Sequence, residues 1–210
     1  MSTILDDLSW RYATKKFDST KKLLDGQLTL LKEGFNLSAS SYGLQPVSLV
    51  VIENQDLKEK LVAHSMEQEQ VANASHLLVF CVQTKIDTDY INDYFTRVQE
   101  IRNTPDEILA PFKEFLLEDF KNKDASEIKL WATKQAYLAM GNVLTVCAVE
   151  KIDACPMEGF IPEEYDEVLG LKEKGLQSVL IMPVGYRAQD DPFASFKKVR
   201  KPLAKAIIEM

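Results

Sequence analysis

The sequence predicts a layered domain of the α+β or α/β class, built from a few buried strands among more numerous helices. Three continuous apolar runs have the length of buried strands, and several longer stretches repeat apolar residues at helical spacing. The 210 residues are 46% hydrophobic. A chain of this size buries roughly 70% of the surface that its unfolded form exposes, so one domain over residues 1–210 is expected.

The apolar spacing places each element in turn. Leu28, Leu31 and Phe35 repeat at helical spacing, and Gln45-Pro46 then begins an extended stretch, because proline disfavours helical geometry in the residue before it. The last segment, 193–210, lacks a strong period until Leu203. The predicted elements are helices around 28–35, 56–65, 90–101, after 105 and over 128–149, and strands at 49–52, 77–82 and 178–185.

The long helix predicted over 128–149 carries apolar residues around more than one stripe. Trp131, Leu138, Leu144 and Val146 do not share a single face. Either a helix in the core or a helix in a subunit interface accounts for this width, and we favour the interface.

Charge is distributed unevenly along the chain. The formal net charge of −7 argues against a dedicated nucleic-acid-binding protein. Residues 1–35 carry six cations and five anions, and residues 197–210 carry five cations and one anion, so the two ends sum to +5 and the segment between them to −12. If the ends meet in space they form a local anion site; otherwise they are two solvated lysine-rich faces.

Cysteine usage and the first residues indicate a cytoplasmic protein. Cys81, Cys147 and Cys155 are odd in number and form no CxxC pair, which favours a reducing compartment. With only His64 and His76 in addition, no metal site is expected. The sequence shows neither a signal-peptide pattern nor an apolar run of about 20 residues, so no membrane association is expected.

The familiar phosphate-binding loops are missing from the sequence. No two of the eight glycines are spaced as GxG, and neither a GxxxxGK[ST] loop nor a GxSxG or HExxH motif occurs. A phosphate ligand would therefore need separate cationic side chains. Arg11 and Lys15, four residues apart, would project to one side of a helical turn, and Lys198 and Arg200 would share one face of an extended segment.

Two segments of small residues suit close approach to a ligand. One runs from Ser38 to Gly43, and the other is Pro156-Met157-Glu158-Gly159-Phe160, which follows the long helix. An ordinary turn is the alternative for each. In the second segment proline fixes the entry and glycine lets the backbone come near a flat ligand.

The order of these motifs along the chain resembles that of the FMN-dependent nitroreductase family, and looks most like its oxygen-insensitive NAD(P)H nitroreductase branch of enteric type. The resemblance covers nearly the whole chain. The motifs that carry it are RYATKKF at 11–17, SASS at 38–41 with Gln45-Pro46, ASH at 74–76, PMEGF at 156–160, GLKEKG at 170–175 and KVR at 198–200.

The resemblance implies an α+β fold with a central, mostly antiparallel sheet surrounded by helices, in an intertwined homodimer with two FMN sites at the subunit interface. The helix over 128–149 would then lie in that interface. NADH or NADPH would be the reductant co-substrate.

The family's site residues carry over by position. Arg11, Lys198 and Arg200 would hold the FMN phosphate, Lys15 would lie near the N1/O2 edge of the flavin, and Ser40 and Ser41 would reach the FMN of the other subunit. Pro156 to Gly159 would lie along one flavin face, with Glu158 as a cleft-lining residue and the only side chain considered for a catalytic role. The remaining cofactor-binding positions are Tyr12, Ala13, Ala39, Gly43, Glu67, Gln70 and Met157, and the substrate-pocket candidates are Tyr42, Phe112, Phe115 and Phe120.

Several positions depart from the enteric pattern. Gln70 stands where a lysine usually approaches the flavin, and Glu67 where an asparagine does; Gly43 and Val47 also replace usual residues, as do Tyr12 and Ala13. Despite these departures we still expect the protein to bind FMN, but its substrate range can differ from that of the enteric enzymes. The leading hypothesis is ping-pong reduction of nitroaromatics or quinones by NAD(P)H. A flavin or enone reductase, or a dimeric flavin-binding module without turnover, is the alternative.

Overall fold

Four antiparallel strands form the central sheet of the computed structural model, which describes residues 3–210. Their spatial order is β1-β2-β4-β3, and the long strand β4 runs antiparallel to both of its neighbours, β2 and β3. The strands are β1 (Val47–Ile52), β2 (His76–Gln83), β3 (Asp153–Ala154) and β4 (Leu176–Gly185). Each of the three predicted strands is present, and the short β3 is an addition.

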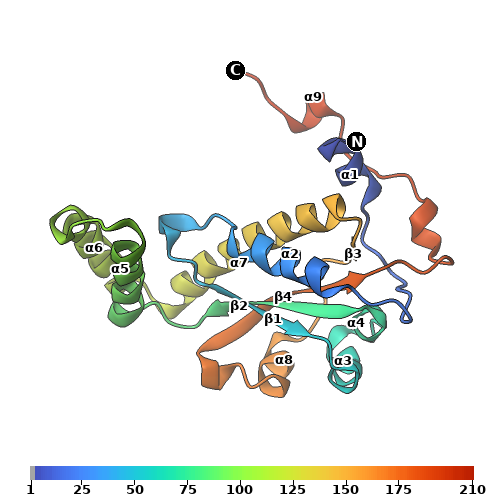
Figure 1. Cartoon of the computed structure of the whole chain (residues 1–210), viewed down its shortest axis with the longest axis horizontal. Coiled ribbons are helices and arrows are strands. Elements are labelled where there is room, and N and C mark those ends of the chain that lie inside the picture. The colour runs from blue at the N-terminus through green and yellow to red at the C-terminus, as the bar shows by residue number, and fades with distance from the viewer. Residues whose placement is uncertain (1–2) are drawn as a thin grey trace.

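Helices cover both faces of the sheet (Figure 1). On one side lie α2 (Asp25–Asn36) and α7 (Ala125–Val149), and on the other lie α3 (Gln55–Val62), α4 (Gln70–Asn73) and α8 (Pro162–Val168). Every predicted helix is present. The sequence reading did not predict α4, α8, α1 (Ile4–Trp10) or α9 (Leu203–Ala206), all of seven residues or fewer, because a short helix shows too few periodic positions.

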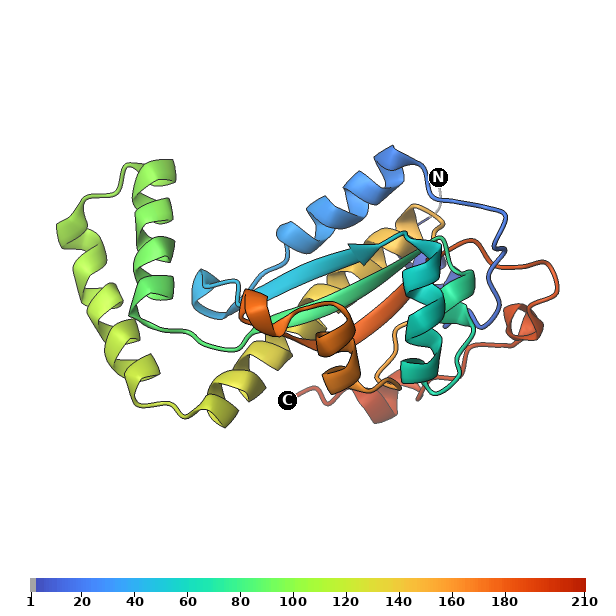
Figure 2. The same ribbon diagram turned by 90° about the horizontal axis from the view of Figure 1, so that it is seen from below.

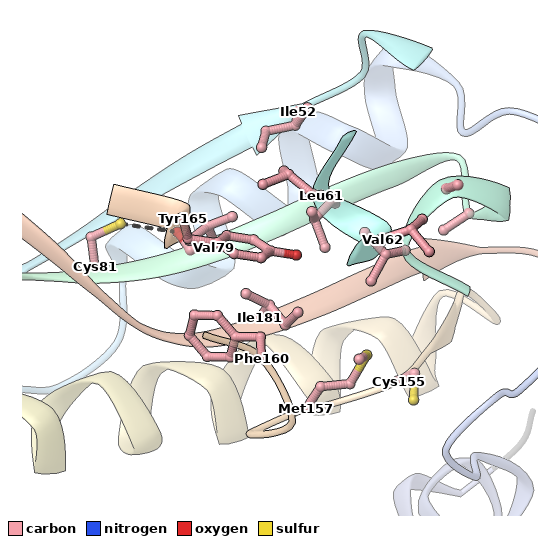
Figure 3. Packing of buried hydrophobic residues seen from close by; sticks show 14 of the residues in the cluster. Ile52, Leu61, Val62, Val79, Cys81, Cys155, Met157, Phe160, Tyr165 and Ile181 are labelled. Atoms are coloured by element: carbon pink, nitrogen blue, oxygen red, sulfur yellow. Dashed lines mark hydrogen bonds between the residues drawn. The ribbon is translucent and has the colours of Figure 1, made fainter. Parts of the chain in front are cut away.

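Strand β2 explains why both faces need covering. All its residues except the last are buried. Because side chains alternate along a strand, Leu77, Val79 and Cys81 enter the core under α3 and α8, whereas Leu78 and Phe80 enter the core under α2 and α7. Figure 3 shows the first of these cores, in which Tyr165 and Phe160 pack beside Leu61 and Ile181.

Strand β1 is less buried than its apolar sequence suggests. Of Val47–Ile52 only Ile52 is fully buried, since β1 lies at the edge of the sheet and pairs only with β2.

A hairpin of two helices projects from one end of the sheet (Figure 2). It consists of α5 (Thr88–Arg102) and α6 (Asp106–Lys121), which pack around Ile91, Phe95 and Leu116 in a small core that Ile128 of α7 also enters. The chain returns from the hairpin into α7, whose start is fixed by a capping box between Asp124 and Glu127.

Helix α7 buries one stripe and exposes another. Ala132, Ala136 and Val143 are buried against the sheet, whereas Leu130 and Leu138 are 59% and 51% exposed. The wide apolar surface predicted from the sequence therefore consists of a core face and a free face. No helix within residues 3–210 combines the length and apolar character needed to cross a membrane.

Candidate functional site

The segment after α1 is extended, which corrects the expected helical turn. Arg11 has φ −67° and ψ 146°, and Ala13 forms a parallel bridge with Ala154 at the end of the sheet. Thr14 is buried, and its N–H donates to the Ala154 carbonyl at 3.2 Å. Arg11 and Lys15 still share a side, because in an extended segment residues two and four apart point the same way.

The two ends of the chain meet at this segment. The Lys198 ammonium donates to the carbonyl oxygen of Arg11. Arg11, Lys15, Lys198 and Arg200 together line one cavity of about 500 Å³, with Pro156 in its wall. The two ends are therefore not separate, and Lys15, Lys198 and Arg200 line the cavity as exposed side chains.

The cations in this cavity are not balanced by carboxylates. Burial, followed by repulsion from Arg11 and Arg200, lowers the pKa of Lys198, and burial and Arg200 lower that of Arg11. In the described part of the chain, none of Arg11, Lys198 and Arg200 forms an ion pair. Such a group of mutually repelling cations is stabilised by an anion placed between them.

A buried carboxylate fixes the backbone of this segment. Asp191 is 4% exposed, and its Oδ2 accepts from the N–H groups of Lys15 and Lys16 at 3.0 and 3.2 Å and from the Tyr12 hydroxyl at 2.9 Å. Burial raises its pKa, but these bonds and the one from Phe193 outweigh burial and hold the pKa below its usual range. The sequence reading missed Asp191, since one aspartate in a polar loop carries no pattern.

Lys15 extends toward the strand edge that carries the second small-residue segment. Its Nζ lies 3.8 Å from Sγ of Cys155. Burial raises the pKa of that thiol, and Lys15 opposes the rise. Figure 3 shows Cys155 and Met157 at the margin of the core. The Lys15 ammonium has no carboxylate partner among the ion pairs of residues 3–210.

The segment 156–159 forms the wall of a second cavity. Met157 is buried and exchanges backbone hydrogen bonds with Ile181, at 2.9 and 3.1 Å, which leaves Glu158 exposed. The cavity has a volume of about 420 Å³ and a mostly apolar lining, and it shares Pro156 with the cationic cavity. Its lining residues are Tyr137, Met140, Gly141, Leu144, Pro156, Met157, Glu158 and Leu180.

Glu158 is tied to the long helix. Its Oε1 accepts the Tyr137 hydroxyl at 2.6 Å, and this bond is the main cause of the raised pKa of Tyr137. The carboxylate therefore orients Tyr137 at the cavity rim.

Of the predicted cofactor-binding positions Gln70 and Glu67, Gln70 contacts segment 156–159. Gln70 is buried and donates to Met157 Sδ at 3.8 Å and to Gln68 Oε1 at 2.9 Å, whereas Glu67 is exposed. Gln68 in turn donates to the Gly159 carbonyl at 3.0 Å. Gln68 is a further residue that sequence reasoning missed, and it links Gln70 to the cavity wall.

The Ser38–Gly43 segment lies elsewhere. The Ser41 N–H donates to Gln135 Oε1 at 2.9 Å, in the first half of α7, whereas Lys151 beyond the end of α7 pairs with Asp7, four residues before Arg11. Gln135 and Val149 are about 20 Å apart along the helix axis. One chain therefore does not bring Ser40 and Ser41 to the Arg11 cavity; Ala39 and Ser40 line a separate cavity of about 370 Å³.

The four aromatic candidates form one cluster with different exposures. The Tyr42 ring lies 6.2–6.4 Å from those of Phe112, Phe115 and Phe120. Phe112 and Phe115 are 41% and 53% exposed, whereas Phe120 is 3% exposed and packs edge-on against Trp131. Tyr42, which is 39% exposed, Phe112 and Phe115 are therefore the rings with the most accessible surface in this cluster.

The geometry joins an anion site to an apolar slot. Within residues 3–210, no group of three or more His, Cys, Asp or Glu side chains is placed to hold a metal ion. A ligand with an anionic group at one end and a largely apolar group at the other fits these two cavities.

A family model and two similar relatives all indicate the same family. Residues 8–186 match the family model described as "Nitroreductase family". The chain is 35% identical over 198 residues to YfkO of Bacillus subtilis, which bears the name of an NAD(P)H nitroreductase, covering 89% of this chain and 90% of YfkO. It is 31% identical over 207 residues to the oxygen-insensitive NAD(P)H nitroreductase of Enterobacter cloacae, covering 95% of each chain.

Two further similarities concern flavins. The chain is 31% identical over 211 residues to the major NAD(P)H-flavin oxidoreductase of Aliivibrio fischeri, covering 97% of each. A structure from Exiguobacterium sibiricum, whose title describes a nitroreductase in complex with FMN, has a TM-score of 0.85 at 20% identity and covers 100% of this chain and 98% of its own. At that identity the match shows a common fold.

Proposed function

The chain belongs to the nitroreductase family, and from this premise we propose that it is an FMN-dependent oxidoreductase that uses NADH or NADPH to reduce nitroaromatics or quinones by two electrons. Relatives that cover nearly the whole chain are named NAD(P)H nitroreductases or an NAD(P)H-flavin oxidoreductase. The observation that carries the proposal is the cavity in which Arg11, Lys198 and Arg200 face one another without a carboxylate partner.

The residues present fit FMN. Its phosphate is a dianion, which the unbalanced cations of the 500 Å³ cavity would neutralise. Its ring is flat and largely apolar, in keeping with the adjoining cavity that shares Pro156. When bound, FMN supplies the chemistry of accepting a hydride and passing on two electrons.

The chain supplies binding, orientation and electrostatics. Arg11, Lys198 and Arg200 would hold the phosphate. Lys15, which has no carboxylate partner and extends to Cys155, would supply a positive charge that favours forms of the ring bearing negative charge. Glu158 is already bonded to Tyr137, so its role is to shape the rim. No protein side chain needs to act as an acid or a base.

We also propose that the protein is a homodimer with the FMN sites at the interface. The Ser38–Gly43 segment contacts α7 at Gln135, near the middle of the helix, whereas the Arg11 cavity lies beside its C-terminal end, and the free face of α7 exposes Leu130, Tyr137 and Leu138. When two such helices pack antiparallel across a twofold axis that passes between Gln135 and Val149, the Gln135 region of one helix lies beside the end of the other. Ser40 and Ser41 of one subunit would then reach the site of its partner.

Two further expectations remain proposals. We propose a single domain over residues 1–210, supported by the family match over 8–186. We also propose a cytoplasmic location, supported by three buried cysteines that form no disulfide.

A flavin reductase is the second candidate. The Aliivibrio fischeri relative is named an NAD(P)H-flavin oxidoreductase, and Gln70 places an uncharged amide where the enteric pattern has a cation. Free FMN, menadione and a nitrofuran, compared as acceptors, separate the two activities, because a flavin reductase uses free FMN at a rate at least equal to the others.

The test of the main proposal begins with the colour of the purified protein. We expect a yellow protein whose flavin absorbance bleaches when NADH or NADPH is added under nitrogen and returns when an acceptor follows. A colourless protein that does not bind added FMN contradicts the proposal. A protein that binds FMN in a 1:1 ratio but oxidises neither nicotinamide with any acceptor is a flavin-binding module instead.

A further inference from the structure

Two adjoining cavities lie between the 38–48 segment and helix α5. The first, of about 370 Å³, is lined by residues 38–40 and by Gln135 of α7. The second, of about 250 Å³, lies between Gly43 and the α5 residues Tyr94 and Arg102. Gln45 and Arg97 line both cavities, so they form the boundary where the two meet.

The second cavity holds a pair of cations that the flavin site does not use. Arg97 and Arg102 both line it, beside the apolar side chains of Val98 and Ile101. Neither guanidinium forms an ion pair with any carboxylate within residues 3–210. Guanidinium groups prefer phosphate oxygens, which they bind in a bidentate manner, and they also stack on flat rings.

The wall opposite α5 is held in place by hydrogen bonds. The Tyr90 hydroxyl donates to the carbonyl oxygens of Leu44 and Gln45 at 2.8 and 2.9 Å, and the Gln45 N–H donates to Ser40 Oγ at 3.0 Å. A wall fixed in this way loses little conformational entropy when a ligand binds.

Gly43 gives this cavity its shape. Its φ is +73°, and a Cβ at this position would lie 2.8 Å from the Tyr94 hydroxyl. Tyr94 therefore occupies the room that a side chain at position 43 would need, and it stands next to Arg97 in the cavity wall.

We propose that Arg97 and Arg102 bind the phosphate groups at the adenylate end of the dinucleotide reductant, with Tyr94 and Ile101 against its flat or apolar parts. This inference rests on the proposed function. The sequence has no glycine-rich dinucleotide loop, so a site for those phosphates would consist of separate side chains. The cavity adjoins the one lined by residues 38–40, a segment that the proposed dimer brings to the flavin, and the cations of the Arg11 cavity are assigned to FMN.

Steady-state kinetics of the FMN-loaded enzyme test the assignment. Arg97→Ala/Arg102→Ala should raise KM for NADH and NADPH by about tenfold while kcat at saturation stays within about twofold. The affinity for FMN should not change. With N-benzyl-1,4-dihydronicotinamide, a reductant without phosphate or adenylate, wild type and variant should have equal kcat/KM.

The matched control is Lys113→Ala/Lys129→Ala. Like the arginine variant, it removes two positive charges, but from the neighbouring helices α6 and α7, and neither lysine lines the cavity. If this control raises KM for NADPH as much as the arginine variant does, the effect is one of overall charge and the assignment is wrong. It is equally wrong if the arginine variant leaves KM unchanged or loses activity with the benzyl reductant in parallel.

Binding of ADP provides a readout without turnover. In calorimetry at low salt the FMN-loaded wild type should bind ADP at least about fivefold more tightly than the arginine variant, and added salt should reduce the difference. Equal affinities overturn the proposal. If the wild type oxidises neither NADH nor NADPH the proposed function fails, whereas the ADP measurement still decides whether Arg97 and Arg102 form a phosphate site.

Discussion

Single side chains from distant parts of the chain determine the charge around the N-terminal segment. Lys198 donates to the backbone of Arg11, and Asp191 accepts from the backbone of Lys15. Both contacts join the 187–200 segment to residues 11–16. The anion site in the Arg11 cavity therefore depends both on the charge of its side chains and on the hydrogen bonds that fix the backbone of residues 11–16.

Arg200 tests the contribution of charge. Arg200→Ala should weaken FMN binding by about 1.5–3 kcal/mol, the usual value of a hydrogen bond to a charged group. Fluorescence titration of the apoprotein with FMN measures the change. Lys201→Ala is the matched control, because Lys201 is the next cation and does not line the cavity. Equal FMN affinity in the two variants would mean that Arg200 is simply solvated.

Asp191 tests the contribution of the backbone. Asp191→Ala leaves the N–H groups of Lys15 and Lys16 without their acceptor and should lower the free energy of unfolding by about 2–3 kcal/mol. The control is Asp190→Ala, which removes an exposed ion pair with Lys16 and should change stability by less than about 0.5 kcal/mol. Urea denaturation compares the two. If both variants lost the same free energy of unfolding, the hydrogen bonds to Asp191 would stabilise the protein no more than the exposed ion pair of Asp190 does.

At the scale of elements, α7 has two roles. Its buried stripe packs on the sheet, and its other stripe exposes Leu130, Tyr137 and Leu138. Three large exposed apolar side chains on one helix of 25 residues favour a partner surface. The small hairpin core of α5 and α6 leaves a second set of exposed side chains, including Ile101 and Ile108, at the end of the molecule where α7 begins.

Leu138 tests the free face of α7. Leu138→Arg places a charge in the proposed interface and should convert the dimer to a monomer, with FMN affinity reduced by at least about tenfold. Light scattering after gel filtration gives the mass, and fluorescence titration gives the affinity. Val168→Arg, on α8 across the sheet, should remain dimeric. A dimeric Leu138→Arg protein with normal FMN affinity would contradict this arrangement of subunits.

At the scale of the whole molecule, one buried lysine makes stability depend on pH. Lys58 of α3 is fully buried, and its Nζ donates to the carbonyl oxygens of Ala74 and Ser75 at 2.5 and 3.2 Å, at the entry to β2. Burial, with smaller contributions from Lys22, lowers its pKa from 10.5 to about 8. Between pH 8 and 10.5 the unfolded chain therefore binds a proton that the folded chain does not.

Stability should consequently rise with pH across this window, because it rises wherever the unfolded state binds more protons. The free energy of unfolding of wild type relative to Lys58→Met should increase by about 1–2 kcal/mol from pH 7.5 to 9.5. Urea denaturation at both pH values measures it, and the variant cancels the contributions of other titrating groups. A difference that does not depend on pH would mean that Lys58 keeps its ordinary pKa in the folded protein.

The sequence by itself determined the elements with strong periodicity and the identity of the charged groups. Apolar runs of strand length predicted β1, β2 and β4, and the order of weak motifs indicated the family, because both signals are local or additive along the chain. It missed Asp191, Gln68 and the short helix α8, since isolated polar residues and a helix of only seven residues show no clear period.

Only the tertiary structure decided which of these groups meet. It brought Lys198 to Arg11, more than 180 positions away in sequence, and it placed Ser41 against Gln135, near the middle of α7. It also made the Arg11–Lys15 segment extended through a bridge between Ala13 and Ala154. Spacing along the chain cannot specify such contacts, because packing of the two ends against the sheet sets which charges face one another.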